Sequence, residues 1–367
     1  SKPGASGEYN ITVENRGTID AYVDSINGID EANQTEPTDI TFSIEGLKLY
    51  DSLPSKQEKT FKVKVNWDSS STSIPNSDKT LTLSINFVQD SGNRPTPTLG
   101  NAAEYLIKNK LSTDITSSGM SGLYAIDNTS ELTTSASPRE YRYIGSNPDN
   151  YIQFNNELWR IIGIFDGQLK IIRANSLEDS RGWGANNNWS NSNYLSGEYY
   201  NSIDSNDQNK IDDYTWKLGG IPTDISGIDT TVKESYNLER GTTVYNGNPT
   251  EWTGKIALIY PSDYGLATSG GSTTNRSSCI SLMWREWYNK DCYNNSWIYG
   301  YLGKRIHLTT LTHSLSDAYN VIVIIDAGIA MRGGVGSQVI VVPALYLTPE
   351  VELSTGTGTI DDPYILK

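Results

Sequence analysis

Residues 151–173 read YIQFNNELWRIIGIFDGQLKIIR, and this stretch decides the fold class of the larger part of the chain. It contains three short apolar segments, separated by the dipeptides Asn155-Asn156 and Asp166-Gly167. Asn, Asp and Gly are the residues that tight two-residue turns prefer, because they tolerate a positive φ. The stretch therefore predicts three antiparallel strands joined by two hairpins.

The sequence on either side of this stretch predicts a mixed unit over residues 101–367. Apolar residues at helical spacing predict a short opening helix at 102–110, and further strands are predicted at 255–260, 321–325 and 339–347. A long segment rich in Asn, Ser and Gly lies between the first and the later strands. We therefore expect an α+β unit with few helices and long loops.

The first ninety residues show the period-2 alternation that is typical of half-buried strands. The alternating apolar residues form four runs: Tyr9, Ile11 and Val13; Ile40, Phe42 and Ile44; Phe61, Val63, Val65 and Trp67; Leu81, Leu83, Ile85 and Phe87. Turn residues such as Asn27-Gly28 lie between the runs, and no helix pattern is visible. Residues 1–90 therefore predict an immunoglobulin-like β-sandwich. The polar, Pro- and Gly-rich residues 91–100 predict a linker, with the domain boundary near Pro97.

Composition and charge argue against several classes of partner. The 367 residues include 29 Lys and Arg against 43 Asp and Glu, which gives a formal net charge of −14. Nucleic acids and anionic membranes bind basic surfaces, so we expect neither as a partner. The longest apolar stretch, 321–342, is interrupted by Asp326, Arg332 and Gln338 and is too polar to insert into a membrane.

The supply of catalytic side chains is also small. The chain has two histidines, His307 and His313, and two cysteines. Nucleophilic catalysis needs a Ser, Cys or Thr beside a base, and the sequence lacks a Gly-x-Ser-x-Gly motif. We therefore expect a protein that is not an enzyme. An enzyme remains an alternative that a deep pocket with converging carboxylates would support.

Cys279 and Cys292 lie thirteen residues apart in a region rich in Gly, Ser and Asn. We expect a disulfide that stabilises this loop, because the abundance of Ser, Thr, Asn and Tyr is typical of extracellular proteins. Two free thiols in a cytosolic protein are the alternative. The chain opens at Ser1 without a methionine, and we expect an export segment to have preceded it or not to have been cloned.

No cofactor is expected, and calcium is the one alternative. Calcium is bound by carboxylates and amide carbonyls that converge on one loop. The best match offers Asp204, Asn206, Asp207, Asp212 and Asp213. This segment lacks the glycine and the terminal glutamate of a helix-loop-helix calcium site, so a solvated acidic loop is favoured.

Several motifs carry a resemblance to a known family. They read YIQFNNELWRIIGIF at 151–165, WTGKIALIYPSDYG at 252–265, PALYL at 343–347 and GTGTIDDPYIL at 356–366. Over essentially 141–367 the chain resembles uncharacterised cell-surface proteins of Gram-positive gut bacteria. That resemblance implies a C-type-lectin-like fold, which includes formylglycine-generating enzymes and the variable ligand-binding proteins diversified by retroelements.

The N-terminal segments 2–4 and 9–23 similarly resemble the immunoglobulin-like domains of exported Gram-positive surface and matrix-fibre proteins. Together the two resemblances imply an extracellular protein at the cell surface of a Gram-positive bacterium.

Between about 307 and 342 the sequence departs from these relatives, while the flanking motifs are kept. A divergent block within an unaltered scaffold is the pattern that targeted diversification of a ligand-binding surface would produce. We expect Val321, Val323, Val341 and Leu345 in the core, and their neighbours on the opposite face of a one-sided sheet to be exposed. An exposed apolar row with polar side chains beside it is typical of an interaction surface. The candidate ligand-binding residues are His307, Leu308, Thr310, His313, Asp317, Tyr319, Ile322, Ile325, Asp326, Ile329, Met331, Arg332, Gln338 and Ile340.

These observations predict a secreted or surface-anchored ligand-binding protein, an adhesin or a receptor-like chain, that recognises an unknown protein or glycan ligand without bond chemistry. The alternative is a structural subunit of a fibre or pilus. The first clear strand begins at Tyr9, and a sandwich that lacks its opening strand can accept one from a neighbouring copy. Self-assembly is the property that separates the two hypotheses.

Overall fold

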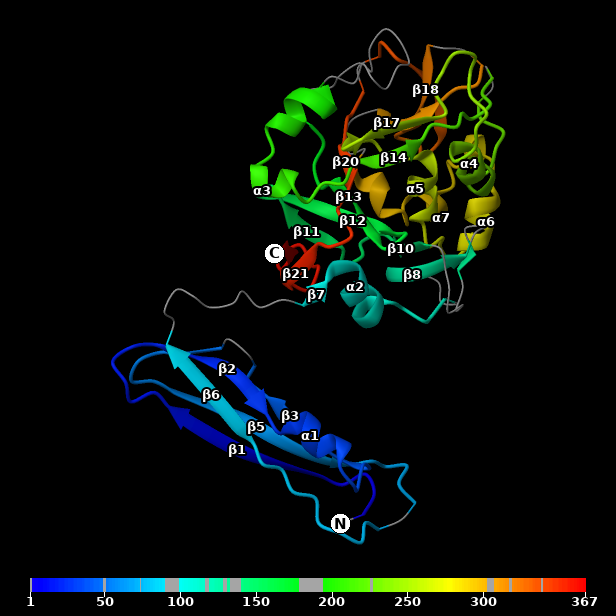
Figure 1. Cartoon of the computed structure of the whole chain (residues 1–367). Coiled ribbons are helices and arrows are strands. Elements are labelled where there is room, and N and C mark those ends of the chain that lie inside the picture. The colour runs from blue at the N-terminus through cyan, green and yellow to red at the C-terminus, as the bar shows by residue number, and fades with distance from the viewer. Residues whose placement is uncertain are drawn as a thin grey trace. The chain divides into compact units, whose positions relative to one another are not determined.

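The computed structural model describes residues 2–48, 51–72, 74–89, 99–115, 119–127, 131–132, 140–177, 194–224, 227–301, 307–316, 319–337 and 339–367. The chain divides into two compact units, Ser1–Pro97 and Thr98–Lys367, which Figure 1 shows in blue to cyan and in cyan to red. This division lies inside the expected linker 91–100. Both units are built mainly of strands, in agreement with the mostly β fold class that the sequence predicts.

The first unit contains, in its described part, two three-stranded antiparallel sheets with the strand orders β1-β5-β3 and β4-β2-β6. The strands are β1 Ser6–Glu14, β2 Ala21–Asn27, β3 Ile40–Glu45, β4 Ser52–Leu53, β5 Glu58–Trp67 and β6 Ser84–Gln89. Apolar side chains from both sheets form one core, with Val23 of β2 packed with Phe61 and Val63 of β5. The alternating pattern of the sequence thus marks inward-facing positions on both sheets.

Two expectations for this unit are wrong. The sequence predicts no helix in this unit, but Gly28, with a φ of 104°, precedes helix α1 (Ile29–Gln34), and its N–H donates to the Glu31 carboxylate at 2.9 Å. The helix buries only Ala32, so it leaves no periodic apolar signal. The opening strand begins at Ser6 rather than Tyr9 and pairs with β5 along its whole length.

The second unit is built on a large sheet that has eleven strands among the described residues. Eight of them follow the order β16-β20-β13-β12-β11-β22-β21-β7, and β10, β8 and β9 extend from β12. The strands are β7 Gly100–Asn101, β8 Gly122–Asp127, β9 Glu131–Leu132, β10 Glu140–Ile144, β11 Tyr151–Phe154, β12 Glu157–Phe165, β13 Gln168–Arg173, β16 Ile256–Ala257, β20 Ala344–Tyr346, β21 Glu352–Thr355 and β22 Tyr364–Leu366.

The stretch 151–173 forms the centre of this sheet as three antiparallel strands. Both connecting turns have positive φ at both positions, with 55° and 55° at Asn155-Asn156 and 49° and 82° at Asp166-Gly167. These values are the ones that a type I′ hairpin requires, so the two predicted hairpins are confirmed. Strand β12 is then long enough to pair with β11 near its beginning and with β10 near its end.

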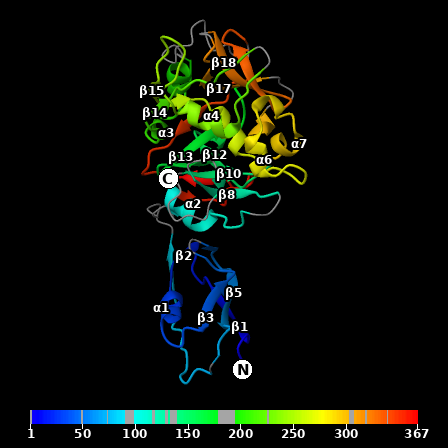
Figure 2. The same ribbon diagram turned by 90° about the vertical axis from the view of Figure 1, so that its right-hand side faces the viewer.

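Helices and two smaller sheets cover the large sheet. The helices are α2 Ala102–Lys110, α3 Ser205–Gln208, α4 Val232–Glu239, α5 Pro261–Leu266, α6 Arg276–Ser281 and α7 Lys290–Tyr293, with the single-turn elements η2 Tyr194–Tyr199, η3 Trp284–Glu286 and η4 Trp297–Tyr301. The small sheets pair β14 Tyr214–Lys217 with β15 Glu251–Gly254, and β17 His307–His313 with β18 Asn320–Ile325 and β19 Ala330–Gly334. Helices α4 to α7 gather on one side of the large sheet (Figures 1 and 2).

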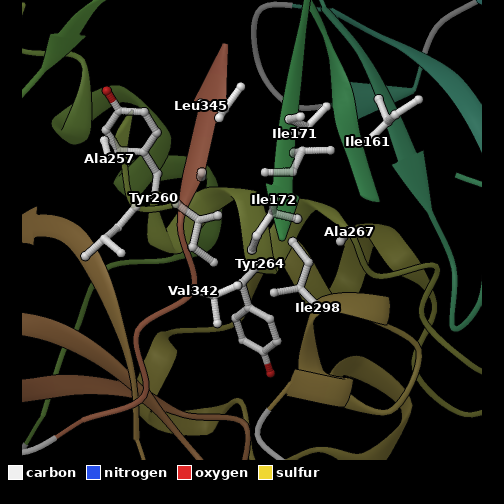
Figure 3. Packing of buried hydrophobic residues seen from close by; sticks show 14 of the residues in the cluster. Ile161, Ile171, Ile172, Ala257, Tyr260, Tyr264, Ala267, Ile298, Val342 and Leu345 are labelled. Atoms are coloured by element: carbon white, nitrogen blue, oxygen red, sulfur yellow. The ribbon is translucent and has the colours of Figure 1, made fainter. Parts of the chain in front are cut away.

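The main core lies between the large sheet and these helices. Figure 3 shows Ile172 of β13 beside Tyr264 of α5 and Ile298 of η4, and Leu345 of β20 belongs to the same cluster. Most of the described tryptophans belong to this core, since Trp159, Trp216, Trp284, Trp287 and Trp297 are all at most 2 % exposed. They form part of the framework of the unit.

The later strand predictions are only partly right. The expected strand at 321–325 is β18, but 255–260 and 339–347 contain only the short strands β16 and β20. Val321, Val323, Val341 and Leu345 are buried, as expected. Cys279 in α6 and Cys292 in α7 form the expected disulfide, with their Cα atoms 5.4 Å apart.

Candidate functional site

A cluster of buried charged side chains lies between the large sheet and helix α5. The carboxylate of Asp263 accepts hydrogen bonds from Lys170 Nζ at 2.6 Å and from Arg142 NH1 at 2.8 Å. All three side chains are at most 1 % exposed. The Asp263 carboxylate also accepts the N–H of Tyr260 at 2.9 Å, which anchors it in the first turn of α5. A buried charge is stable only when it is paired in this way.

Glu140 extends this cluster toward the surface. Its carboxylate accepts a hydrogen bond from Arg142 Nε at 2.8 Å and another from the Tyr236 hydroxyl at 2.5 Å. Arg240 lies farther out, 3.9 Å from Glu140, with its guanidinium 3.8 Å from the centre of the Tyr236 ring and 4.9 Å from that of Tyr260. Arg240 is thus held by rings and by an anion while its side chain stays 24 % exposed.

The exposed side of the cluster lines a pocket of about 270 Å³, which we call the tyrosine pocket. Tyr260, Tyr346, Phe165 and Glu140 are buried and form its floor, and the half-buried Tyr214, Tyr236 and Arg240 form its walls. The exposed Lys217 and Asp166 stand at its rim. The rings of Tyr214 and Tyr346 stack with their centres 3.6 Å apart. The pocket therefore offers flat apolar surfaces beside charges of both signs.

The pKa values of the cluster follow from burial and pairing. Burial raises the pKa of Asp263, but Lys170 and Arg142 outweigh it and hold that pKa well below the usual range. Burial lowers the pKa of Lys170 to about 8, although Asp263 acts in the opposite direction. Burial also raises the pKa of Glu140, but Arg142 and Arg240 bring it below its ordinary value. Asp263 and Glu140 are therefore both ionised near neutral pH.

Glu239 is the exception in this neighbourhood. It is fully buried at the end of α4, and its carboxylate accepts hydrogen bonds from the N–H and hydroxyl of Ser262. Burial raises the pKa of Glu239 to about 7, because Arg240 and Ser262 offset the cost of burial only in part. The Glu239 carboxyl group next to Arg240 therefore changes from neutral to negatively charged as the pH rises through about 7.

The side chains that line the tyrosine pocket determine what it can bind. The nine lining residues include two carboxylates, Glu140 and Asp166, and no serine, threonine, cysteine or histidine. Glu140 is ionised and already hydrogen-bonded, which makes it a poor proton donor. What the pocket can supply is aromatic surface, the remaining N–H groups of Arg240 and the rim charges.

The residues that the sequence proposes as ligand-binding lie elsewhere, on and around the sheet β17-β18-β19. Thr310, His313, Ile322 and Ile340 are at most 2 % exposed, so their expected exposure is wrong. The reason is that β18 is covered on both faces. Ile322 packs into the main core, whereas Val321 on the other face packs in a small cluster closed by the segment after β19.

Other candidates of this block remain accessible in part. Tyr319 is 68 % exposed and Asp326 is exposed. Half-buried positions are Ile325, Ile329, Met331 and Arg332, of which Ile325 and Met331 pack on the small cluster. His307 and Leu308 lie at the beginning of β17, while Asp317 and Gln338 are outside the described residues. The block therefore presents scattered side chains rather than one continuous row.

His313 gives this block a measurable pH dependence. Burial lowers the pKa of His313 to about 4 from an unfolded value near 6.5, and its Nδ1 lies 3.2 Å from Asn248 Nδ2. As the pH falls below 6.5, His313 of the unfolded chain takes up a proton, whereas His313 of the folded chain does so only near pH 4. The free energy of unfolding therefore decreases between these two pH values.

We expect the free energy of unfolding of wild type to fall relative to that of His313→Gln by about 2 kcal/mol between about pH 7.5 and pH 5. Urea unfolding at each pH measures it. The quantity to follow is the difference in free energy of unfolding between wild type and His313→Gln. Glu239, whose pKa is raised, stabilises both proteins as the pH falls, and its contribution cancels in this difference. A difference independent of pH would contradict the burial of His313.

The carboxylates of the expected acidic loop have partners within the protein. Asp204 caps α3, Asp207 pairs with Lys210 at 2.8 Å, Asp212 accepts from Gln168 and Asp213 pairs with Lys255. Among the residues that the structure describes, no group of three or more His, Cys, Asp or Glu side chains is placed to hold a metal ion.

Sequence reasoning did not find the tyrosine pocket, although a signal was present. Arg142 and Lys170 interrupt otherwise apolar strands, in YRYI and LKII, and Asp263 lies inside an apolar motif. Charged residues at such positions need buried partners of opposite sign. These charged residues therefore predict a buried charged cluster, but they do not predict where that cluster reaches the protein surface.

Comparison of the chain with family models, with curated proteins and with solved structures finds no match. No helix in the described part of the chain is long and apolar enough to cross a membrane. The function must therefore be argued from the site itself.

Proposed function

We propose that this chain is an extracellular ligand-binding protein that recognises a sugar residue of a glycan in the tyrosine pocket. The observation that carries the proposal is the pocket itself, in which aromatic rings lie beside the charged groups of Glu140, Arg240 and Lys217. A sugar ring has a C–H face that an aromatic ring can cover, and hydroxyl groups that charged side chains can bind. A pocket of about 270 Å³ has the size for one such ring.

The cluster below the pocket supports recognition of a defined ligand shape. Arg240 is positioned by Tyr236 and Tyr260, and Tyr260 is itself held by a hydrogen bond from its hydroxyl to the Lys217 carbonyl at 2.8 Å. Binding groups that are already fixed lose little conformational freedom when a ligand arrives. The pocket is therefore suited to non-covalent binding.

Location and architecture form part of the same proposal. The disulfide between Cys279 and Cys292 favours an oxidising, extracellular compartment. The two-sheet N-terminal unit suits an immunoglobulin-like stalk, and the second unit a C-type-lectin-like recognition domain. That residues 307–342 are a diversified surface stays a prediction, and its support is weaker because Ile322 and Ile340 are buried.

A fibre subunit is the second candidate function. Among the described residues each of the two small sheets has two edge strands, β1 and β3 in one and β4 and β6 in the other, and an edge strand can accept a strand from another copy, which favours this function. The pairing of β1 with β5 along its whole length disfavours it, because the position beside β5 is already filled. Filaments seen by electron microscopy would support assembly.

A glycan array tests the proposed function. We expect wild type to be retained on a restricted set of glycans, and Arg240→Gln to bind the same glycans at least about tenfold more weakly, because hydrogen bonds to a charged group are lost. Arg285→Gln is the matched control, an exposed arginine of the same unit that pairs with Asp229. Absence of any retained glycan, or equal retention of folded Arg240→Gln, would refute the proposal.

A further inference from the structure

A second pocket, of about 350 Å³, lies on the second unit and shares no lining residue with the tyrosine pocket. Arg160 of β12 lines it, together with Tyr151 of β11 and with Trp297 and Tyr301 of η4. The segment Ala174–Ser176 forms another wall, and Arg173 NH1 fixes its backbone by donating to the carbonyls of Asn175 and Ser176 at 3.2 and 3.0 Å. The pocket is thus built from ordered elements.

Arg160 is unusual because it is a buried cation without a carboxylate. It is 7 % exposed, and no Asp or Glu side chain pairs with it among the described residues. Two aromatic rings replace the counter-ion, since the guanidinium carbon lies 4.4 Å from the ring centres of both Tyr151 and Trp297. Rings stabilise a desolvated cation only in part, so an anion brought to Arg160 gains a strong partner.

The guanidinium of Arg160 also has N–H groups without a partner among the described residues. Nε donates to Asn150 Oδ1 at 2.8 Å, and NH2 donates to the Pro148 carbonyl at 3.2 Å. Of the five N–H groups of an arginine, three remain without a partner in the described part of the chain, and they belong to NH1 and NH2. This end of the guanidinium is the edge that binds a carboxylate with two parallel hydrogen bonds.

A second unsatisfied group lies in the same place. The hydroxyl of Tyr301 is buried and has no hydrogen-bond partner among the described residues. A buried hydroxyl without a partner is costly, and a ligand oxygen in the pocket would satisfy it. Burial also raises the pKa of Tyr301, so the hydroxyl stays protonated and able to donate.

We propose that this pocket binds a small ligand through its carboxylate, held by NH1 and NH2 of Arg160 and by the hydroxyl of Tyr301. The remaining lining, from Gly300 and Ala174–Ser176, is small and includes the polar side chains of Asn175 and Ser176, so it fits a hydroxylated body such as a sugar acid better than an apolar one. The site is independent of the tyrosine pocket and does not rest on the function proposed for it.

Titration calorimetry of the full chain with glucuronate, and with glucose as the neutral probe of the same size, tests this site at constant ionic strength. We expect glucuronate to bind at least about tenfold more tightly than glucose, because only glucuronate carries the carboxylate. Equal affinities, or binding of neither probe, would overturn the proposal.

Variants locate the binding. Arg160→Lys keeps the charge but loses the two-pronged geometry, and we expect its affinity for glucuronate to fall at least about tenfold. Tyr301→Phe removes only a hydroxyl without a partner, so it folds, and we expect about a threefold loss. Arg285→Lys, at an exposed arginine outside both pockets, should keep the wild-type affinity. If Arg160→Lys does not fold, Tyr301→Phe decides, and an affinity for glucuronate equal to that of wild type would reject the site. Loss of glucuronate binding in Arg240→Gln, with binding kept in Arg160→Lys and Tyr301→Phe, would also reject it.

Discussion

Asp263→Asn is expected to lower the free energy of unfolding by about 3–5 kcal/mol, the largest single effect among the changes considered for this chain. The substitution keeps the shape of the side chain but removes the one negative charge that Lys170 and Arg142 share at 2.6 and 2.8 Å. Both cations are at most 1 % exposed, so water cannot solvate the charge that loses its partner. Urea unfolding at neutral pH measures the loss.

The matched control is Glu251→Gln, which removes the carboxylate of an ion pair with Lys217 whose two side chains are about half exposed. An exposed pair contributes at most about 1 kcal/mol, so this variant should unfold nearly as wild type does. Lys170→Met in the Asp263→Asn background should recover part of the loss, because one unpaired cation disappears with it. An Asp263→Asn protein as stable as Glu251→Gln would show that the buried cluster is not formed as described.

The double variant Cys279→Ser/Cys292→Ser is expected to unfold with about 3 kcal/mol less free energy than wild type. The disulfide closes a loop with a sequence separation of 13 residues and ties α6 to α7, and releasing a loop of that length restores this much chain entropy to the unfolded state. Both cysteines are fully buried, so the serine hydroxyls add a further cost. Urea unfolding under oxidising conditions measures the difference.

Ser277→Ala provides the control, since Ser277 is exposed on the same helix α6 and its loss should change stability by no more than about 0.5 kcal/mol. Wild type with a reducing agent should approach the double variant. Stability that is the same with and without the reducing agent would mean that the two thiols are not paired, and it would remove the main support for an extracellular location.

The parts of the fold that the sequence predicts correctly depend on neighbours along the chain. The hairpins at Asn155-Asn156 and Asp166-Gly167 need only residues that accept a positive φ between apolar runs. Helix α2 at Ala102–Lys110 likewise follows from local spacing. Where the local signal is weak, as in the six-residue helix α1, the prediction fails.

The error in block 307–342 has a physical cause that its residues display. Residues 321–325 are VIVII, an unbroken apolar run, and such a run is typical of a strand buried on both faces rather than on one. Alternation along a one-sided sheet predicts an exposed Ile322, but β18 has no solvent face, because the main core covers one side and the Val321 cluster the other.

The two pockets could not be predicted, because they combine residues far apart in the chain. The tyrosine pocket joins Glu140 of β10 with Arg240 after α4 and Tyr346 of β20. Their proximity depends on strand order in the large sheet, which local patterns do not determine. The charged residues inside apolar strands were the only local indication.

We propose that recognition takes place in the tyrosine pocket rather than on the block 307–342. Two tyrosine variants test it on the same glycan: Tyr214→Ala removes a half-buried wall of the pocket, and Tyr319→Ala removes an exposed ring of the block. Measured by titration calorimetry, Tyr214→Ala should bind at least about tenfold more weakly than wild type and Tyr319→Ala equally well. Loss of binding in Tyr319→Ala with full binding by Tyr214→Ala would contradict the claim.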